Sequence, residues 1–257
     1  MGILNLTPDS FSDGGLFVQP VTALARAKAM SAEGAALIDL GAESSRPGAV
    51  EISAEEELAR LLPPLRAIAT ACDIMLSVDT YKAQVADQAL AHGADIINDI
   101  WGLQRDLDMA CTIAKHGAGV VIMHNQTGTE YAGDIVQEIC AFFQKSIQIA
   151  QDAGIDTKKI ILDPGIGFGK TTGQNLEVLA RLSEFKVLGF PLLLGTSRKS
   201  VVGNTLNLPV AERLEGTLAT SVHGLIHGAS IFRVHDVQAN LRALAMAQAI
   251  CAQPFKS

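Results

Sequence analysis

The sequence is poor in cysteine, and its few cysteines are not arranged for a metal site or a disulfide framework. The four are Cys72, Cys111, Cys140 and Cys251, in a chain of 257 residues. None forms a Cys-x-x-Cys pair, and none lies at metal-ligand spacing from a histidine. A zinc module and a disulfide-stapled secreted domain are therefore disfavoured. We expect reduced thiols in a cytoplasmic protein.

Long apolar runs are also missing. Every apolar run is far shorter than the roughly 20 residues that a membrane-spanning helix requires. The first run, Gly2-Ile3-Leu4, is not preceded by the basic segment that opens a secretory signal. We therefore expect neither a membrane span nor a secretory signal.

Positive charge is in short supply. Lysine and arginine number 20 against 27 acidic residues, which gives a formal net charge of -7. This balance disfavours non-specific binding to nucleic acid or to an anionic membrane surface. A small-molecule site can still be locally basic, and the 48% hydrophobic content is enough for a large core. We expect small-molecule partners and neither nucleic acid nor membrane.

Short apolar runs alternate with amphipathic helical stretches along the whole chain. The runs consist mostly of leucine and β-branched residues without polar alternation, which is typical of parallel strands covered on both faces. We expect eight strands, at residues 2–5, 37–40, 74–78, 96–98, 120–123, 160–162, 192–194 and 231–234. Helices are expected between them, for instance at residues 21–33, 54–71, 135–153 and 212–227.

A Gly-Ala pair recurs between helical stretches and strands. Glycine suits the left-handed position that ends a helix, so each pair predicts a helix stop before a strand. No linker or low-complexity segment divides the chain, and the length matches the ~250 residues of one α/β barrel. We predict a single (β/α)8 TIM-barrel domain over residues 1–257, with an open doubly wound sheet as the alternative. The pairs are Gly34-Ala35, Gly93-Ala94, Gly117-Ala118 and Gly228-Ala229.

Nearly every predicted strand ends in a polar or charged residue. Helix capping explains some of these residues, because Asp and Asn are common caps. Active sites of such barrels lie at the carboxyl ends of the strands, so the asymmetry favours an enzyme. The residues are Asn5, Asp39, Asp79, Asn98 with Asp99, His124, Asp163, Ser197 with Lys199, and Arg233 with His235.

These residues divide by charge along the barrel. Asp79, Asn98 and Asp163 can accept hydrogen bonds from a fused ring rich in N–H donors. Arg233 stands in an apolar run, where an unpaired charge is costly, so it should face a ligand or a carboxylate. With His235 and the other polar groups of strands seven, eight and one, it suits phosphate oxygens. The pattern predicts a heterocycle bound deep in the barrel, with phosphate toward one side.

Two further features have alternative interpretations. The glycine-rich segment 165–173 has the look of a phosphate-binding loop, but Pro164 replaces the first glycine that a Walker sequence requires. A glycine-rich turn between strand and helix is the simpler interpretation. Lys199 could form a Schiff base, as lysines near strand ends do in barrel aldolases, but it lies several residues past Leu194, which disfavours that chemistry. A solvated lysine is the alternative.

Two long motifs are similar to the signatures of dihydropteroate synthases. They are Asn5-Leu-Thr-Pro-Asp-Ser-Phe-Ser-Asp-Gly-Gly15 and Gly41-Ala-Glu-Ser-Ser-Arg-Pro-Gly48. The resemblance extends over nearly the whole chain, through shorter segments at residues 77–80, 97–99, 162–170, 195–200 and 233–235. It implies a barrel that condenses 6-hydroxymethyl-dihydropterin pyrophosphate with p-aminobenzoate.

The same resemblance implies a role for each matched residue. Substrate contacts are expected from Ser45, Arg46, Pro47, Asp79, Asn98, Met123, Asp163, Phe168, Lys199, Ser200, Arg233 and His235. Among these, catalytic roles fall to Asp79, Asp163, Lys199, Arg233 and His235. Asn5 is expected to hold the Mg²⁺ that accompanies pyrophosphate, and residues 9–15 to form a loop over the mouth. The resemblance also implies a homodimer and competition by sulfonamides at the p-aminobenzoate site.

Two other activities would use part of the same pattern of residues. A pterin-binding barrel that serves a corrinoid protein in methyl transfer would share the carboxylate-lined pocket. It would have no need of the Ser45-Arg46-Pro47 loop or of the Arg233 and His235 pair. A non-catalytic pterin-binding domain would bind without turnover, and nothing in the sequence indicates a broken site. The loop motifs therefore favour the synthase.

Overall fold

The computed structural model describes residues 1–7, 19–44 and 50–253. Its strands form one eight-stranded parallel sheet whose spatial order follows the chain. The strands are β1 (Gly2–Asn5), β2 (Leu37–Gly41), β3 (Met75–Asp79), β4 (Ile96–Asp99), β5 (Gly119–Met123), β6 (Ile160–Asp163), β7 (Leu192–Leu194) and β8 (Ala229–Phe232).

The sheet closes on itself between its first and last strands. Gly2 forms a parallel bridge with Val234. The Ile3 amide donates to the Val234 carbonyl at 2.9 Å, and the Val234 amide donates to the Met1 carbonyl at 2.9 Å. The predicted (β/α)8 barrel is confirmed, and the open sheet is excluded because no free edge remains at this seam.

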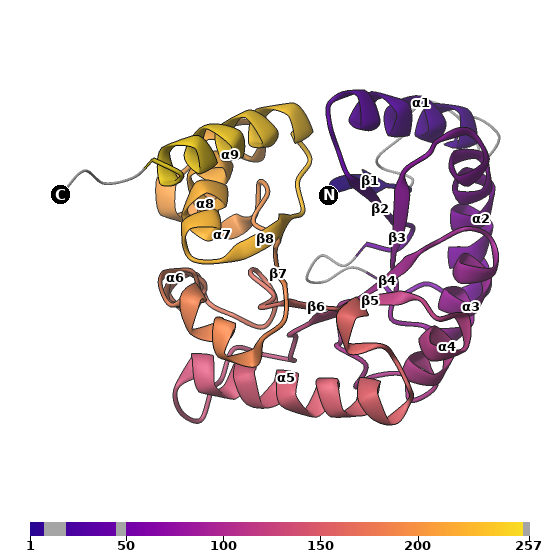
Figure 1. The fold of residues 1–257 in the computed structure, drawn as a ribbon, viewed down its shortest axis with the longest axis horizontal. Coiled ribbons are helices and arrows are strands. Elements are labelled where there is room, and N and C mark those ends of the chain that lie inside the picture. The colour runs from indigo at the N-terminus through magenta and orange to yellow at the C-terminus, as the bar shows by residue number, and fades with distance from the viewer. Residues whose placement is uncertain (8–18, 45–49, 254–257) are drawn as a thin grey trace.

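The helices surround the strands as an outer ring (Figure 1). Helix α2 covers the predicted residues 54–71, and the other expected helices agree to within two residues at each end. None of the described helices is long and apolar enough to cross a membrane. The helices are α1 (Gln19–Ala32), α2 (Ala54–Ala71), α3 (Ala83–Ala91), α4 (Met109–His116), α5 (Ile135–Asp152), α6 (Thr172–Ala180), α7 (Ser200–Leu206), α8 (Leu214–Ile226) and α9 (Val237–Cys251).

The Gly-Ala helix stops are confirmed by backbone geometry. Gly34, Gly93, Gly117 and Gly228 all have positive φ, between 60° and 105°. At the first three, the following alanine amide donates back to a carbonyl of the helix, as in a Schellman ending. Each such turn points the chain into the next strand, which is why the repeat was readable from sequence.

Two layers of inward-facing side chains fill the barrel. Ile96, Val121 and Leu193 form a small apolar cluster, with Met1, Ile161 and Ile231 packed against it. Successive side chains of a strand point to opposite faces, so residues two positions further along face the same interior. Those residues include Asn98, Met123, Asp163, Gly195 and Arg233. An apolar floor thus lies beneath a polar layer at the carboxyl ends of the strands.

The last strand departs from its predicted bounds. It ends at Phe232 rather than at residue 234, so Arg233 lies just past the strand and not within it. The pairing with β7 slips between Leu192 and Leu193, and Ala229 already pairs with Leu192. Pairing therefore begins two residues earlier than the apolar run suggested. Arg233 still donates its amide to the Leu194 carbonyl at 3.0 Å, which holds it at the barrel mouth.

Candidate functional site

Strand register brings the predicted polar residues into rows at one end of the barrel. Asn5 pairs with Gly41, and Gly41 pairs with Asp79. Asp79 in turn pairs with Asn98, which completes a row across β1 to β4. On the other side of the barrel, Met123 pairs with Asp163. Residues far apart in sequence therefore share one layer.

Arg233 connects two carboxylates at the centre of this layer. Its Nε donates to Asp39 Oδ2 at 2.6 Å, and its Nη2 donates to Asp79 Oδ2 at 3.0 Å. The prediction that Arg233 faces a carboxylate is confirmed. Asp39 is fully buried and also accepts from Ser77 Oγ at 2.5 Å. This aspartate lies two residues before the end of β2, yet it belongs to the same inward face.

Asp39 is the residue of the centre to which sequence analysis gave no role. It was noted only as a polar strand end. Three hydrogen bonds converge on it, the third from Asn98 Nδ2 at 3.2 Å. The available signal was a carboxylate inside the otherwise apolar run 37–41, which is costly unless it is paired. Asp39 therefore orients both Arg233 and Asn98.

Asn98 presents an unused acceptor. Its Nδ2 is directed to Asp39, which leaves the side-chain oxygen on the other side. That oxygen is buried and has no hydrogen-bond partner among the described residues. A buried acceptor without a partner costs about 1–3 kcal/mol. An N–H donor of a bound ring would remove this cost.

Burial shifts the acidity of both aspartates predicted at this end. It raises the pKa of Asp79 to about 7, and the charge of Arg233 acts in the opposite direction. Burial also raises the pKa of Asp163, against the favourable charge of Lys199. The Asp163 carboxylate accepts from the Gly165 amide at 2.8 Å. Both groups are therefore buried acids held beside cations, which is typical of functional sites.

Asp163 and Lys199 face the same small space beside Gly195. A Cβ built on Gly195 would lie 3.6 Å from Lys199 Nζ and 3.8 Å from Asp163 Oδ2. Glycine at this position keeps that space open. Lys199 is the N-cap residue of α7, and its Nζ donates to the Ile166 carbonyl at 2.5 Å. Burial lowers the pKa of Lys199 to about 8, with Asp163 acting to raise it.

His235 is held by the loop that follows β7. Its Nδ1 lies 2.9 Å from Ser197 Oγ, and the same hydroxyl accepts from the His235 amide at 3.1 Å. Ser197 is itself buried, so this contact fixes the ring beside the mouth. Strands seven, eight and one are neighbours around the closed barrel, as expected, and His235 and Arg233 share one side of it.

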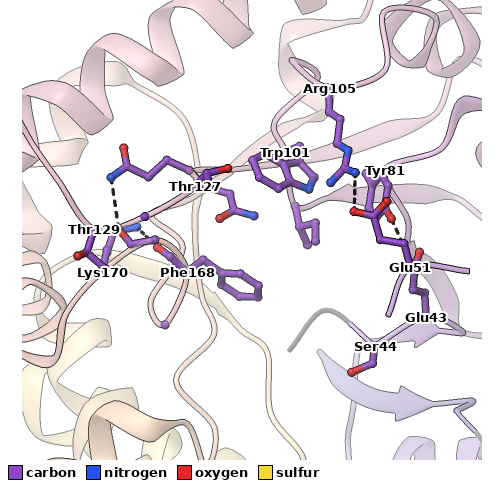
Figure 2. Close-up of a pocket in the computed structure, with 16 residues that line it drawn as sticks. Glu43, Ser44, Glu51, Tyr81, Trp101, Arg105, Thr127, Thr129, Phe168 and Lys170 are labelled. Carbon is purple, nitrogen blue, oxygen red and sulfur yellow. Dashed lines mark hydrogen bonds and ion pairs between the residues drawn. The ribbon is translucent and has the colours of Figure 1, made fainter. Parts of the chain in front are cut away.

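A cavity of about 560 Å³ opens above the polar layer. Phe168 lies on one side of it, and Trp101 and Arg105 lie on another (Figure 2). The Arg105 guanidinium stacks 4.3 Å from the Tyr81 ring centroid and donates to Glu51 at 2.6 Å. Trp101, which follows β4, is thus part of the cavity wall. Asp79 and Asp163 do not line this cavity, so it forms the outer part of the site.

The glycine-rich turn after β6 is closed by contacts within the protein. Lys170 Nζ lies 2.9 Å from His124 Nδ1 and donates to the carbonyls of Gly165 and Phe168, both at 3.0 Å. A phosphate-binding loop would direct several amides outward, but the Gly165 amide here donates to Asp163. Sequence analysis missed the pair of Lys170 and His124. Burial lowers the pKa of Lys170 to about 7.

His124 should make folding stability depend on acidity. Burial, and next the charge of Lys170, lower its pKa to about 3, whereas an unfolded histidine titrates near 6.5. Below about pH 6.5 the unfolded chain takes up a proton that the folded chain refuses. The free energy of unfolding should therefore fall by about 2 kcal/mol between pH 7 and pH 5 through this group. Denaturant unfolding of His124→Gln at both pH values should lack this component, and an unchanged slope would contradict the assignment.

The structure describes only some of the other predicted site residues. Ser45, Arg46, Pro47 and the 9–15 loop lie outside the described residues. Ser200 is exposed as the first residue of α7, one residue after Lys199. Met123 is buried at the end of β5. The substrate contacts assigned to all of these residues stay predictions.

The sequence and the fold of this chain are both similar to those of known proteins. A sequence profile of the family described as pterin binding enzyme matches residues 1–235. A dihydropteroate synthase from Clostridium beijerinckii is 52% identical over 251 residues, which covers 97% of this chain and 93% of that protein.

Two crystal structures of dihydropteroate synthases are also similar. The one from Clostridium difficile, determined in the presence of pteroic acid, has a TM-score of 0.96, 52% identity, and coverage of 98% of this chain and 96% of its own. The one from Yersinia pestis, in complex with a sulfonamide drug, has a TM-score of 0.92, 44% identity, and coverage of 98% and 94%.

Proposed function

Because this chain belongs to the family of dihydropteroate synthases, we propose that it joins 6-hydroxymethyl-7,8-dihydropterin pyrophosphate to p-aminobenzoate, forming 7,8-dihydropteroate and pyrophosphate. The observation that carries the proposal is the polar layer of the barrel. There, buried acceptors for a ring lie beside the buried cation Arg233. Similarity at 52% over nearly the full chain favours this reaction over methyl transfer to a corrinoid protein.

The pterin ring binds in the polar layer. Its ring N–H and amino groups donate to Asp79, to Asp163 and to the unused oxygen of Asn98. Lys199 lies beside Asp163 across Gly195, and Met123 occupies the same inward face. The apolar floor beneath this layer excludes water from the lower side of the ring. Ring recognition therefore depends on the acceptors that strand register gathers.

The pyrophosphate binds toward strands seven, eight and one. Arg233 and His235 supply N–H donors there, and Ser197 holds the His235 ring. Planar guanidinium groups suit phosphate oxygens because they donate two parallel hydrogen bonds. Arg233 is already paired with Asp39 and Asp79, so it links the two halves of the substrate.

The residues present fit a magnesium ion at Asn5. A Cβ built on Gly41 would lie 3.9 Å from Asp79 Oδ2 and 4.0 Å from Asn5 Oδ1. An amide oxygen and a carboxylate oxygen thus both face the space that a side chain at Gly41 would fill. Mg²⁺ prefers such hard oxygen ligands and keeps several waters, so few protein ligands are needed. When bound, it would neutralise charge on the pyrophosphate.

Catalysis depends on stabilising the charges that develop on the pterin methylene and on the leaving pyrophosphate. The C–O bond to pyrophosphate breaks, the electron pair leaves with the phosphate, and the exocyclic methylene becomes cation-like. The carboxylates of Asp79 and Asp163 stabilise that positive charge, and Arg233 and His235 stabilise the leaving group. The amine nitrogen then forms the new C–N bond and loses a proton. Phe168, Lys199 and Ser200 line the site for p-aminobenzoate, and Ser45, Arg46 and Pro47 complete the substrate contacts.

We also propose a cytoplasmic homodimer. The four cysteines are unpaired, as a reducing compartment would keep them. Large apolar side chains are exposed late in the chain, among them Ile226, Leu241, Met246 and Ile250 on α8 and α9. Such exposure is typical of a surface that another copy covers. Light scattering of the purified protein should give twice the mass of 27.1 kDa.

The assay that tests the proposed reaction measures pyrophosphate release. Purified protein is given the pterin pyrophosphate and Mg²⁺, with and without p-aminobenzoate. Release that requires the amine and yields a pteroate product is expected. Pterin binding without release would contradict the proposed reaction and direct the search toward a methyl-transfer partner.

A further inference from the structure

Lys170 is a buried lysine with a complete set of hydrogen-bond partners. A lysine ammonium has three N–H donors. Those of Lys170 have three acceptors within 3.0 Å, namely His124 Nδ1 and the carbonyls of Gly165 and Phe168. The residue is 9% exposed. None of these partners belongs to the residues proposed to bind the pterin ring, so the mechanism above leaves Lys170 without a role.

The turn at residues 165–169, to which Lys170 donates, packs closely against the loop after β5. Gly165 has φ +68°, and a Cβ there would lie 1.9 Å from the His124 carbonyl oxygen. Gly169 has φ +54°, and its Cβ would lie 2.7 Å from the Gln126 carbonyl oxygen. Only glycine permits such an approach of two backbones. The turn therefore has one position relative to β5, which the ammonium of Lys170 holds from inside.

Phe168 stands at the tip of this turn, where it meets Lys199. The Lys199 ammonium lies 4.7 Å from the centroid of the Phe168 ring. Lys199 also donates to the Ile166 carbonyl of the same turn at 2.5 Å. Phe168 and Lys170 both line the outer cavity (Figure 2), but the Lys170 ammonium is directed to the carbonyls of the turn, at Gly165 and Phe168. A shift of the turn would thus move the cavity wall more than the deep acceptors Asp79 and Asn98, which belong to other strands.

We propose that Lys170, together with His124, is a positioning residue for the aromatic amine: it fixes the 165–169 turn so that Phe168 forms one wall of the amine site. The inference rests on the proposed function, because it assigns the Phe168 side of the cavity to p-aminobenzoate. Because all three N–H donors of Lys170 are directed to His124 and to the turn, Lys170 acts through Phe168. Its loss therefore affects the amine more than the pterin.

The test uses Lys170→Gln, which keeps two N–H donors on a shorter side chain, and Lys170→Met, which keeps none. Lys159→Met is the matched control, because Lys159 Nζ also donates to a backbone carbonyl, that of Gly117, at the opposite end of β6. For K170Q we expect the KM for p-aminobenzoate to rise about tenfold or more, the scale of one lost charge-assisted hydrogen bond. The KM for the pterin pyrophosphate should stay within about twofold. K159M should change neither constant.

Hydrogen exchange supplies a readout that does not depend on turnover. The Phe168 amide donates to the Gly165 carbonyl at 3.1 Å within the turn. In K170Q, or in K170M where it folds, this amide should exchange faster than in the wild type and in K159M. Unchanged exchange would show that Lys170 does not fix the 165–169 turn, and would overturn the proposal. Faster exchange with equal changes in both KM values would overturn the assignment of this turn to the amine site. An inactive wild type would instead refute the proposed reaction itself.

Discussion

Asp79→Asn is expected to lower kcat/KM by about 30- to 1,000-fold, which corresponds to about 2–4 kcal/mol of lost electrostatic stabilisation in the transition state. The substitution keeps the shape of the side chain, and the amide oxygen can still accept from Arg233 Nη2 at 3.0 Å. It removes the negative charge that faces the cation-like methylene. The measurement is steady-state pyrophosphate release at saturating p-aminobenzoate.

The acidity of Asp79 gives this variant a second signature. Because burial raises its pKa to about 7, a falling pH protonates the wild-type carboxylate through that range. Wild-type kcat/KM should therefore decline below about pH 7, and this decline should be weaker in D79N. Asp87→Asn serves as the control, because Asp87 is a surface carboxylate on α3 paired with Lys115. Wild-type turnover in D79N would remove Asp79 from the mechanism.

Arg233→Met should lower the free energy of unfolding by about 3–5 kcal/mol, the usual cost of leaving buried charges without a partner. The arginine is 17% exposed at its side chain, and its partners Asp39 and Asp79 are 0% and 10% exposed. Methionine preserves much of the volume but none of the donors. Denaturant unfolding at pH 7 measures the change, and pyrophosphate release should fall as well.

A double variant separates charge from packing in this prediction. If the cost of R233M comes from the stranded Asp39 charge, then Asp39→Asn combined with R233M should be less destabilised than the sum of the single variants. Arg181→Met is the surface comparison. Arg181 pairs with Asp134, Glu177 and Glu184, but it is 28% exposed, so its loss should cost far less. Strict additivity at residues 39 and 233 would show that the pair does not act as a unit.

The barrel could be predicted because its evidence is local. Each buried strand is a short run of leucine and β-branched residues, and each Gly-Ala pair ends a helix through a positive φ at glycine. These signals depend on the residues themselves and on neighbours a few positions away. The strand displaced most, β8, is the case in which pairing with a neighbour overruled the apolar run.

For the site as well, the sequence shows local features but not contacts between distant residues. That Asp79, Asn98, Asp163, Lys199, Arg233 and His235 follow apolar runs was readable from the sequence, and the structure brings them to one end of the barrel. The hydrogen bonds and ion pairs between side chains of the site could not be predicted from the sequence. The contact of Arg233 with Asp39 joins residues 194 positions apart, and that of Lys170 with His124 joins residues 46 positions apart.

The sequence by itself determined the class of fold, the order of its elements and the kinds of side chain at the mouth, because these follow from periodicity, glycine geometry and residue chemistry. Only the tertiary structure decided which charge neutralises which. Closure of β1 on the β8 seam sets the register, and the two-residue period then turns Asp39, Asp79 and Arg233 to the same interior. Register is a property of the closed sheet as a whole, so no single strand contains it.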